Sequence, residues 1–185
     1  WRMTMTESLP LYIYVDGSSA RTGEDLATSD TSAGWGFCVV SGDSGVGQGG
    51  GEVIFERSGS VVTDNDAEEY LGAEIGSNNT AELSAVAQAM RWLLAEGGSQ
   101  AVVIRGDSQY ALNLASAVWR GKKNRTLVLS TQALWGEVAS LRSLTPEHVR
   151  AHRGHRWNER ADHLAFRAMQ GKDALPLQFW KPGRR

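Results

Sequence analysis

The order of apolar segments along the 185-residue chain restricts its fold more than any other feature. Three strand patterns come first, in residues 11–16, 33–42 and 52–62, without a helix pattern between them. Helix and strand patterns then alternate toward the C-terminus. Consecutive strands pair antiparallel through short connections, whereas strands separated by helices are added in parallel. The chain is therefore predicted to form an α/β domain with a mixed sheet.

The later elements are predicted from periodicity and end signals. A helix in residues 79–96 is closed by Gly97 and Gly98, and 101–107 is a short, mostly apolar strand. Further elements are predicted as helices in 108–119, 127–141 and 157–170 and a strand in 145–152. The acidic segment 63–76 is predicted to be a linker, and the Pro/Gly/Arg tail to be disordered.

The composition is ordinary for a globular protein, with 41% hydrophobic and 22% charged residues. No run approaches 18 uninterrupted apolar residues, and the first ten residues contain no signal-peptide core, so we expect no membrane partner. The single cysteine, Cys38, lies in the apolar run GWGFCVV and is predicted to be a buried small hydrophobe. These features predict an intracellular protein of a reducing compartment, cytoplasm or nucleus.

The formal net charge of −2 hides an uneven distribution. Residues 1–82 contain three Arg or Lys against 14 Asp or Glu. The run RGKKNR, residues 120–125, contains four basic residues and no acid, and residues 146–185 contain nine basic residues against four acidic ones. Basic zones on an otherwise acidic chain fit a polyanionic partner, although such zones are also ordinary solvated faces.

The stretch NNTAELSAVAQAMRWL, residues 78–93, places one acid at the start of an apolar helix pattern. Asn79 and Glu82 have the spacing of a capping box, which offers one role for the acid. Glu82 also lies about 40° from Val86 around the helix, on the buried face, where a bare carboxylate is costly. Capping a helix and binding a cation are both open roles for Glu82 at this point.

Four acids stand at or near junctions between predicted elements. They are Asp16, Glu82, Asp107 and Asp162. Each also has an ordinary structural role; Asp107, for example, fits the N-cap of the helix that follows it. Ligand sites of open α/β sheets gather where strands end, so these acids are candidates for one site. Converging carboxylates would need a cation, and oxygen ligands without cysteine favour Mg²⁺ or Mn²⁺ over zinc.

Four segments of the chain resemble the signature blocks of ribonuclease H type 1, including the related domains of reverse transcriptases. They are YVDGSS, SNNTAELSAV, RGDSQYALN and HVRAHRGHRWNERADHLA, in this order. The similarity extends from Leu11 to Gln170. The resemblance implies a ribonuclease H-like fold with a five-stranded mixed sheet and helices on both faces. It places the catalytic domain in residues 11–171, between a disordered or added segment 1–10 and a tail 172–185.

The resemblance also implies the chemistry of the site. It makes the four acids the metal-binding carboxylates for two Mg²⁺ ions, with Mn²⁺ as a substitute, and it makes His152 the mobile catalytic histidine. Two such ions activate a water and stabilise the departing 3′-oxygen of a phosphodiester. His152 can carry protons, because a histidine changes charge near neutral pH. His155 and His163 are expected to be structural.

The substrate that the resemblance implies is an RNA–DNA hybrid duplex, cut in its RNA strand to give 5′-phosphate and 3′-hydroxyl ends. Groove shape and the 2′-hydroxyl would distinguish the RNA strand. The expected contacts to the duplex are the Gly17 and Ser18 backbone, Asn78, Asn79 and Gln109 on the RNA side, and Ser77 at a DNA phosphate. Asn78 and Asn79 also fit as cap and turn residues.

Trp119, Lys122 and Lys123 occupy the place of the family's basic handle, which is shorter here than in the long-handled bacterial members. From an expected helix of about a dozen residues, the basic run would lie about 20 Å from the metals and contact duplex phosphates. The isolated protein is expected to be a monomer. Whether it is part of a larger polypeptide is left open by the sequence. The alternative function is a catalytically silent ribonuclease H-like module that binds nucleic acid or serves as a scaffold.

Overall fold

The computed structural model describes residues 9–21, 23–45, 49–118, 120–151 and 155–185. The elements follow one another as the strands β1 (Leu11–Ser19), β2 (Ala33–Ser41) and β3 (Glu52–Ser60), helix α1 (Asn78–Glu96), strand β4 (Val102–Gly106), helices α2 (Gln109–Ala115) and α3 (Arg125–Leu141), strand β5 (Leu144–His148) and helix α4 (Arg156–Met169). A short 3₁₀ turn, Glu24–Leu26, lies between β1 and β2. None of the described helices is both long and apolar enough to cross a membrane.

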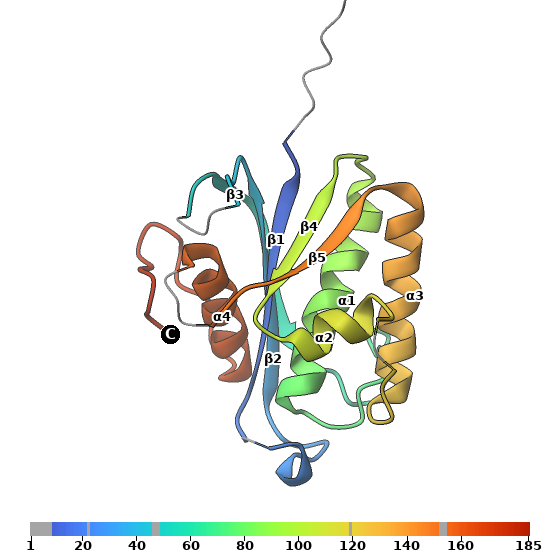
Figure 1. The fold of residues 1–185 in the computed structure, drawn as a ribbon. Coiled ribbons are helices and arrows are strands. Elements are labelled where there is room, and N and C mark those ends of the chain that lie inside the picture. The colour runs from blue at the N-terminus through green and yellow to red at the C-terminus, as the bar shows by residue number, and fades with distance from the viewer. Residues whose placement is uncertain (1–8, 22, 46–48, 119, 152–154) are drawn as a thin grey trace, which may run out of the picture.

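The five strands form one mixed sheet in the order β3-β2-β1-β4-β5. Strand β1 pairs antiparallel with β2, and β2 pairs antiparallel with β3, whereas β4 runs parallel to both β1 and β5. Helices α1, α2 and α3 lie on one face of this sheet and α4 lies on the other (Figure 1). The predicted mixed sheet with helices on both faces is confirmed.

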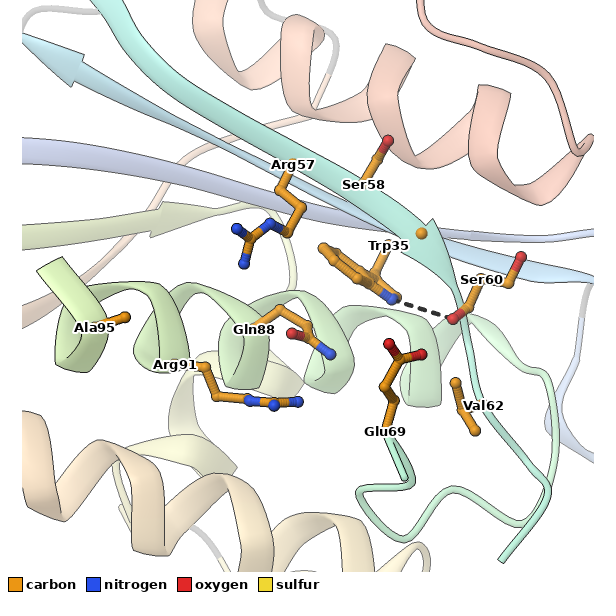
Figure 2. Close-up of a pocket in the computed structure, with 10 residues that line it drawn as sticks. Trp35, Arg57, Ser58, Ser60, Val62, Glu69, Gln88, Arg91 and Ala95 are labelled. Atoms are coloured by element: carbon orange, nitrogen blue, oxygen red, sulfur yellow. Dashed lines mark hydrogen bonds between the residues drawn. The ribbon is translucent and has the colours of Figure 1, made fainter. Parts of the chain in front are cut away.

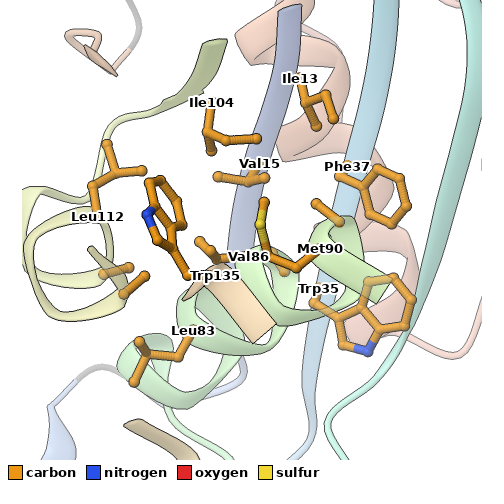
Figure 3. Close-up of a cluster of buried hydrophobic side chains, with 14 of the residues drawn as sticks. Ile13, Val15, Trp35, Phe37, Leu83, Val86, Met90, Ile104, Leu112 and Trp135 are labelled. Carbon is orange, nitrogen blue, oxygen red and sulfur yellow. The ribbon is translucent and has the colours of Figure 1, made fainter. Parts of the chain in front are cut away.

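The alternation of side chains along β1 divides the core into two layers. Ile13 and Val15 pack with Phe37 and Met90 on the α1 face of the sheet (Figure 3). Tyr14, one position along, packs with residues of α4 on the other face. Cys38, predicted to be buried, belongs to this second layer and is fully buried. Because a central strand is covered on both faces, almost every residue of β2 is buried.

Several predicted element ends are wrong by a few residues. Strand β1 continues past Asp16, because Ser18 and Ser19 still pair with Gly34 and Ala33 of β2. Helix α2 ends at Ala115, four residues before the predicted end. Strand β3 ends two residues early, α3 begins two residues early, and β5 covers residues 144–148 in place of 145–152. The predicted linker between β3 and α1 contains no helix or strand.

The prediction of a disordered tail is wrong, because residues 172–185 pack along α4. Trp180 is 3% exposed and joins the core layer on the α4 face. The backbone of Leu175 is held at both ends: its carbonyl accepts from Arg160 Nη1 at 2.8 Å, and its N–H donates to His163 Nε2 at 3.0 Å. The prediction relied on the polar composition of the segment, whereas a few apolar side chains anchor it to α4.

Candidate active site

Close packing of β1 against the start of α1 brings the first two acids together. Asp16 lies in β1 and is 4% exposed, and Gly17 follows it. A Cβ atom at position 17 would stand 2.4 Å from the backbone nitrogen of Glu82, so only glycine allows this approach. The Gly17 N–H donates to Asp16 Oδ1 at 2.8 Å. Gly17 therefore sets both the distance between the two elements and the orientation of one carboxylate.

Ser77, and neither Asn79 nor Glu82, caps helix α1. The Ser77 hydroxyl accepts from the Thr80 N–H at 3.1 Å, and the Thr80 hydroxyl accepts from the Ser77 N–H at 2.9 Å. The capping role considered for Asn79 and Glu82 is therefore wrong. Glu82 is only 9% exposed, and its buried Oε2 atom has no hydrogen-bond partner among the described residues. A buried carboxylate oxygen in this state is costly unless a cation binds it.

The third acid, Asp107, follows β4 directly. The N-cap role predicted as its alternative belongs to Ser108, whose hydroxyl accepts from the Ala111 N–H at 3.1 Å. Strand β4 runs parallel to β1 with Arg105 opposite Tyr14, so Asp107, two residues further on, stands level with Asp16. The start of α1 also packs against β1 at this level. The topology thus brings Asp107 to the position where Asp16 and Glu82 meet.

The three acids form a compact cluster. One carboxylate oxygen from each of Asp16, Glu82 and Asp107 lies within 4.8 Å of the other two. Burial raises the pKa of Asp16 and of Glu82 well above the ordinary carboxyl value, and the charge of Asp107 raises both further. A divalent cation would reverse this cost, because it stabilises the ionised form of every acid around it. The donor set and the unpaired Glu82 oxygen therefore fit a hard cation such as Mg²⁺.

Asp162 lies outside this cluster of three. It projects from α4, which packs on the opposite face of the sheet, and its carboxylate forms a two-pronged ion pair with Arg185 at 3.0 and 3.2 Å. Burial and the charge of Asp107 raise the pKa of Asp16 most, and the charge of Asp162 raises this pKa further. The structure thus brings together three of the four predicted carboxylates. The fourth, Asp162, is paired with the Arg185 guanidinium.

The histidines differ in their surroundings. His152 and Trp119 lie outside the described residues. His163 is fully buried, accepts a backbone hydrogen bond through Nε2 and packs against the Trp180 ring, which fits the structural role predicted for it. Burial, and then the charge of Arg160, lowers its pKa. His155 stands at the N-cap of α4, and its buried Nδ1 has no hydrogen-bond partner in the part of the chain that the structure describes.

Sequence reasoning missed His148. This residue ends β5, and its Nε2 lies 3.1 Å from the backbone oxygen of Asp107. The parallel register pairs His148 with Gly106, the residue before Asp107. The sequence does show a histidine near the end of one predicted strand and an acid at the end of another. It does not show that these two strands pair, because strand pairing is decided by the tertiary structure.

The predicted duplex contacts fall into two groups. Asn78 and Gln109 are the exposed first residues of α1 and α2, close in the chain to Glu82 and Asp107, and Asn79 beside Asn78 is half-buried. Ser18 and Ser77 are only 8% and 1% exposed. Because the Ser77 hydroxyl is engaged in the α1 cap, that side chain is a poor candidate for a phosphate contact.

The basic run after α2 follows a shorter helix than predicted. Helix α2 is 7 residues long, a rise of about 10 Å, so the helix from which the distance of about 20 Å was expected is not formed as predicted, and that distance stays a prediction. Lys122, Lys123 and Arg125 line a hollow of about 440 Å³ together with Glu74. Both lysines are exposed, and Lys123 Nζ stands 3.7 Å from the carboxylate of Asp25. The lysines therefore remain accessible to a polyanion, although this part of the surface is less purely basic than the run suggested.

The sheet topology and the acid cluster together define a ribonuclease H-like protein with a carboxylate centre. A comparison with family models agrees, since the RNase H model matches residues 9–170. The chain belongs to the RNase H family.

Curated relatives support this assignment. The chain is 32% identical to Ribonuclease HI of Helicobacter pylori over 135 residues, which cover 70% of this chain and 87% of that protein. It is also 32% identical to Ribonuclease H of Syntrophomonas wolfei over 113 residues, 55% of this chain and 76% of the relative. The curated relatives are nucleases by name, and the predicted resemblance to the ribonuclease H family is confirmed.

Solved structures share the fold. RNase H1 of the archaeon Halobacterium salinarum superposes with a TM-score of 0.61 at 23% identity, covering 88% of this chain and 98% of its own. LC11-RNase H1, solved in complex with an RNA/DNA hybrid, gives a TM-score of 0.60 at 20% identity over 87% of this chain and 97% of that one. At these identities the likeness concerns the fold alone.

Proposed function

We propose that the protein is a metal-dependent endonuclease that hydrolyses the RNA strand of RNA–DNA hybrids. Water attacks the phosphorus, the P–O3′ bond breaks, and the products carry a 5′-phosphate and a 3′-hydroxyl. The observation that carries this proposal is the cluster of Asp16, Glu82 and Asp107 at the edge of the sheet. Membership of the RNase H family and the hybrid bound by the related LC11 enzyme support it.

The three clustered acids would hold the metal, and Asp162 would join them once it leaves Arg185. Two Mg²⁺ ions, or Mn²⁺ in their place, would supply activation of the attacking water and neutralisation of charge on the leaving oxygen. The Gly17 N–H keeps Asp16 Oδ1 oriented. The hydrogen bond between His148 and the Asp107 carbonyl steadies the chain at the third acid. The protein's own contribution is therefore a prearranged set of oxygen ligands.

We further propose that His152 accepts and releases protons beside this centre, as the family resemblance implies. The duplex would lie across the N-terminal ends of α1 and α2, where Asn78 and Gln109 are exposed. Amide side chains donate and accept hydrogen bonds, so they suit the 2′-hydroxyl and base edges of the wide RNA minor groove. Lys122 and Lys123 would meet phosphates farther along the duplex.

A hydrolysis assay separates this function from the alternative of a silent scaffold. Three end-labelled substrates are compared: an RNA–DNA hybrid, single-stranded RNA and double-stranded DNA. Each is incubated with Mg²⁺ and, separately, with a chelator. Wild-type protein is expected to cut only the RNA of the hybrid, internally and only with metal. Asp16→Asn, which keeps the side-chain volume, is the matched control and should be inactive. Equal failure of wild type and Asp16→Asn to cut, with both binding the hybrid, would support the scaffold.

A further inference from the structure

A second hollow lies away from the acid cluster, between the edge strand β3, helix α1 and the segment that follows β3 (Figure 2). Its volume is about 460 Å³, within the range of small-molecule sites. Arg91, which lines it, comes nine residues after Glu82 on α1. This spacing places it about 13 Å along the helix and about 180° around it. The hollow is therefore separate from the proposed catalytic site.

Two arginines from different elements enter this hollow. Arg57 comes from β3 and Arg91 from α1, and Gln88 lies between them in the view of Figure 2. Arg57 stacks over the Phe55 ring, with its guanidinium carbon 5.0 Å from the ring centre. Within the described part of the chain, no carboxylate pairs with either guanidinium. Both arginines are exposed, and two guanidiniums without a carboxylate partner beside an amide suit an anion.

The floor of the hollow is formed by a packed indole ring. Trp35 lies in it, stacked on Phe37 at 6.2 Å between ring centres, and its Nε1 donates to the Ser60 carbonyl at 3.2 Å. Gly59 is the β3 partner of Trp35, and a Cβ atom there would come within 2.8 Å of the indole. The glycine thus lets the indole lie under the edge strand. Ser58 points away from the hollow, toward α4 (Figure 2).

The opposite side of the hollow is acidic. Glu69, from the segment after β3, faces the space across from Arg57 (Figure 2). Among the described residues no cation pairs with it, although it shares the hollow with two arginines. A ligand that spans the hollow would therefore place an anion at the arginines and a hydrogen-bond donor at Glu69.

We propose that this hollow binds a small phosphomonoester with a hydroxyl-bearing body, such as a sugar phosphate or a nucleoside monophosphate. The phosphate lies between Arg57 and Arg91, and a hydroxyl donates to Glu69. A phosphomonoester carries a charge of about −1.5 to −2 at neutral pH and three acceptor oxygens, which match two guanidiniums from two directions. A carboxylate carries half this charge and fewer acceptors.

Calorimetric titration of the metal-free protein in a chelator tests the site without engaging the acid cluster. The probes are ribose 5-phosphate, adenosine monophosphate, ribose, inorganic phosphate and malate. The two phosphomonoesters are expected to bind with a Kd between about 1 μM and about 1 mM, tighter than inorganic phosphate. Ribose is expected not to bind. The comparison of the two phosphomonoesters shows whether a base contributes.

Matched variants locate the binding. Arg57→Gln and Arg91→Gln should each weaken ribose 5-phosphate about tenfold or more, since each removes a charged hydrogen bond. Glu69→Gln should weaken ribose 5-phosphate but should not weaken inorganic phosphate, because the amide cannot accept the hydroxyl as a charged partner and does not repel the phosphate. Arg21→Gln removes an exposed arginine elsewhere and should change nothing. Thermal melts of each variant without ligand check that the fold is intact.

The site assignment is overturned by absence of phosphomonoester binding up to about 10 mM, a Kd too weak to be specific. It is also overturned if Arg21→Gln weakens binding as much as Arg91→Gln does, or if malate binds as tightly as ribose 5-phosphate. Hydrolysis of the RNA–DNA hybrid should be unchanged in Arg57→Gln and Arg91→Gln. The two proposals therefore stand or fall by separate measurements.

Discussion

Single residues at the carboxylate centre work against the stability of the metal-free fold. Asp16 and Glu82 are buried beside each other and beside Asp107, so ionising them is costly without a cation. Enzymes commonly hold such groups in place because function, and not stability, requires them. The unpaired Oε2 atom of Glu82 is the clearest sign of this conflict.

Asp16→Asn is therefore predicted to raise the stability of the metal-free protein while abolishing hydrolysis. The amide removes one negative charge from the cluster, which should stabilise the fold by about 1 kcal/mol and raise Tm by about 2–4 °C. Thermal melts with and without Mg²⁺ measure this, and Asp107→Asn should behave alike. A wild-type Tm that ignores Mg²⁺, together with an active Asp107→Asn variant, would contradict the metal assignment.

His152→Ala is predicted to lower kcat by one to three orders of magnitude without weakening hybrid binding. General acid–base assistance contributes about 10²–10⁴-fold, and solvent partly replaces it. Steady-state kinetics and a binding titration measure the two effects. His155→Ala, at the N-cap of α4, is the control and should act through Tm. Equal kinetic losses with unchanged melting in both variants would show that His152 has no special role.

At the scale of elements, α1 and α3 are tied together at their C-terminal ends. Arg142, the C-cap residue of α3, is 7% exposed and donates through Nη1 to Glu96 Oε2 at 2.9 Å. Its Nε donates to the Gln100 carbonyl at 2.7 Å. Burial alone would raise the pKa of Glu96, but hydrogen bonds from Arg142 and from the Gly98 N–H outweigh it and lower the pKa. The ionised form of Glu96 is thus the one that the fold favours.

Glu96→Gln is predicted to cost about 0.5–1 kcal/mol at pH 7, a value kept small by the partial exposure of Glu96. A lowered folded-state pKa means that the stabilisation is present above the unfolded pKa of about 4.3 and is lost as the pH falls through the folded value. Urea unfolding of both proteins from neutral to acidic pH measures it. A stability difference that persists unchanged at pH 3 would show that the charge is irrelevant.

The connection between α2 and α3 also has a testable role. Lys122→Ala with Lys123→Ala is predicted to raise KM, leave kcat nearly unchanged, and flatten the salt dependence of binding. Each lost phosphate contact should reduce the log–log slope by somewhat under one. Titrations of metal-free protein on a hybrid at several salt concentrations measure the slope. Parallel slopes for wild type and variant would move the contact to the basic C-terminal region.

At the scale of the whole molecule, the two faces of the sheet are covered by different sets of helices. Helices α1, α2 and α3 cover one face, whereas α4 is the helix that the structure describes on the other face (Figure 1). The C-terminal segment completes this second layer, with Trp180 packed against the same cluster as Tyr14 and Trp157. Arg160 of α4 links this layer to the sheet, because it forms an ion pair with Glu56 of β3 at 2.6 Å. The segment is thus part of the folded domain.

Trp180→Ala is predicted to reduce the free energy of unfolding by about 3 kcal/mol, as expected for a truncated buried aromatic. Tm should fall by about 6–12 °C. Phe179→Ala is the matched control, because Phe179 is 66% exposed and should cost less than about 0.5 kcal/mol. Equal melting of the two variants would mean that the segment does not pack as described.

The sequence by itself determined the element order, the mixed sheet, the family and the acids at the element junctions, because periodicity and local motifs carry that information. The tertiary structure alone decided that Ser77 and Ser108 cap the helices beside Glu82 and Asp107, since competing cap residues stand one to five positions apart. It alone paired Asp162 with Arg185, placed His148 beside Asp107 and folded the tail onto α4. These contacts join residues far apart in the chain, and their energies depend on burial and register that no local pattern encodes.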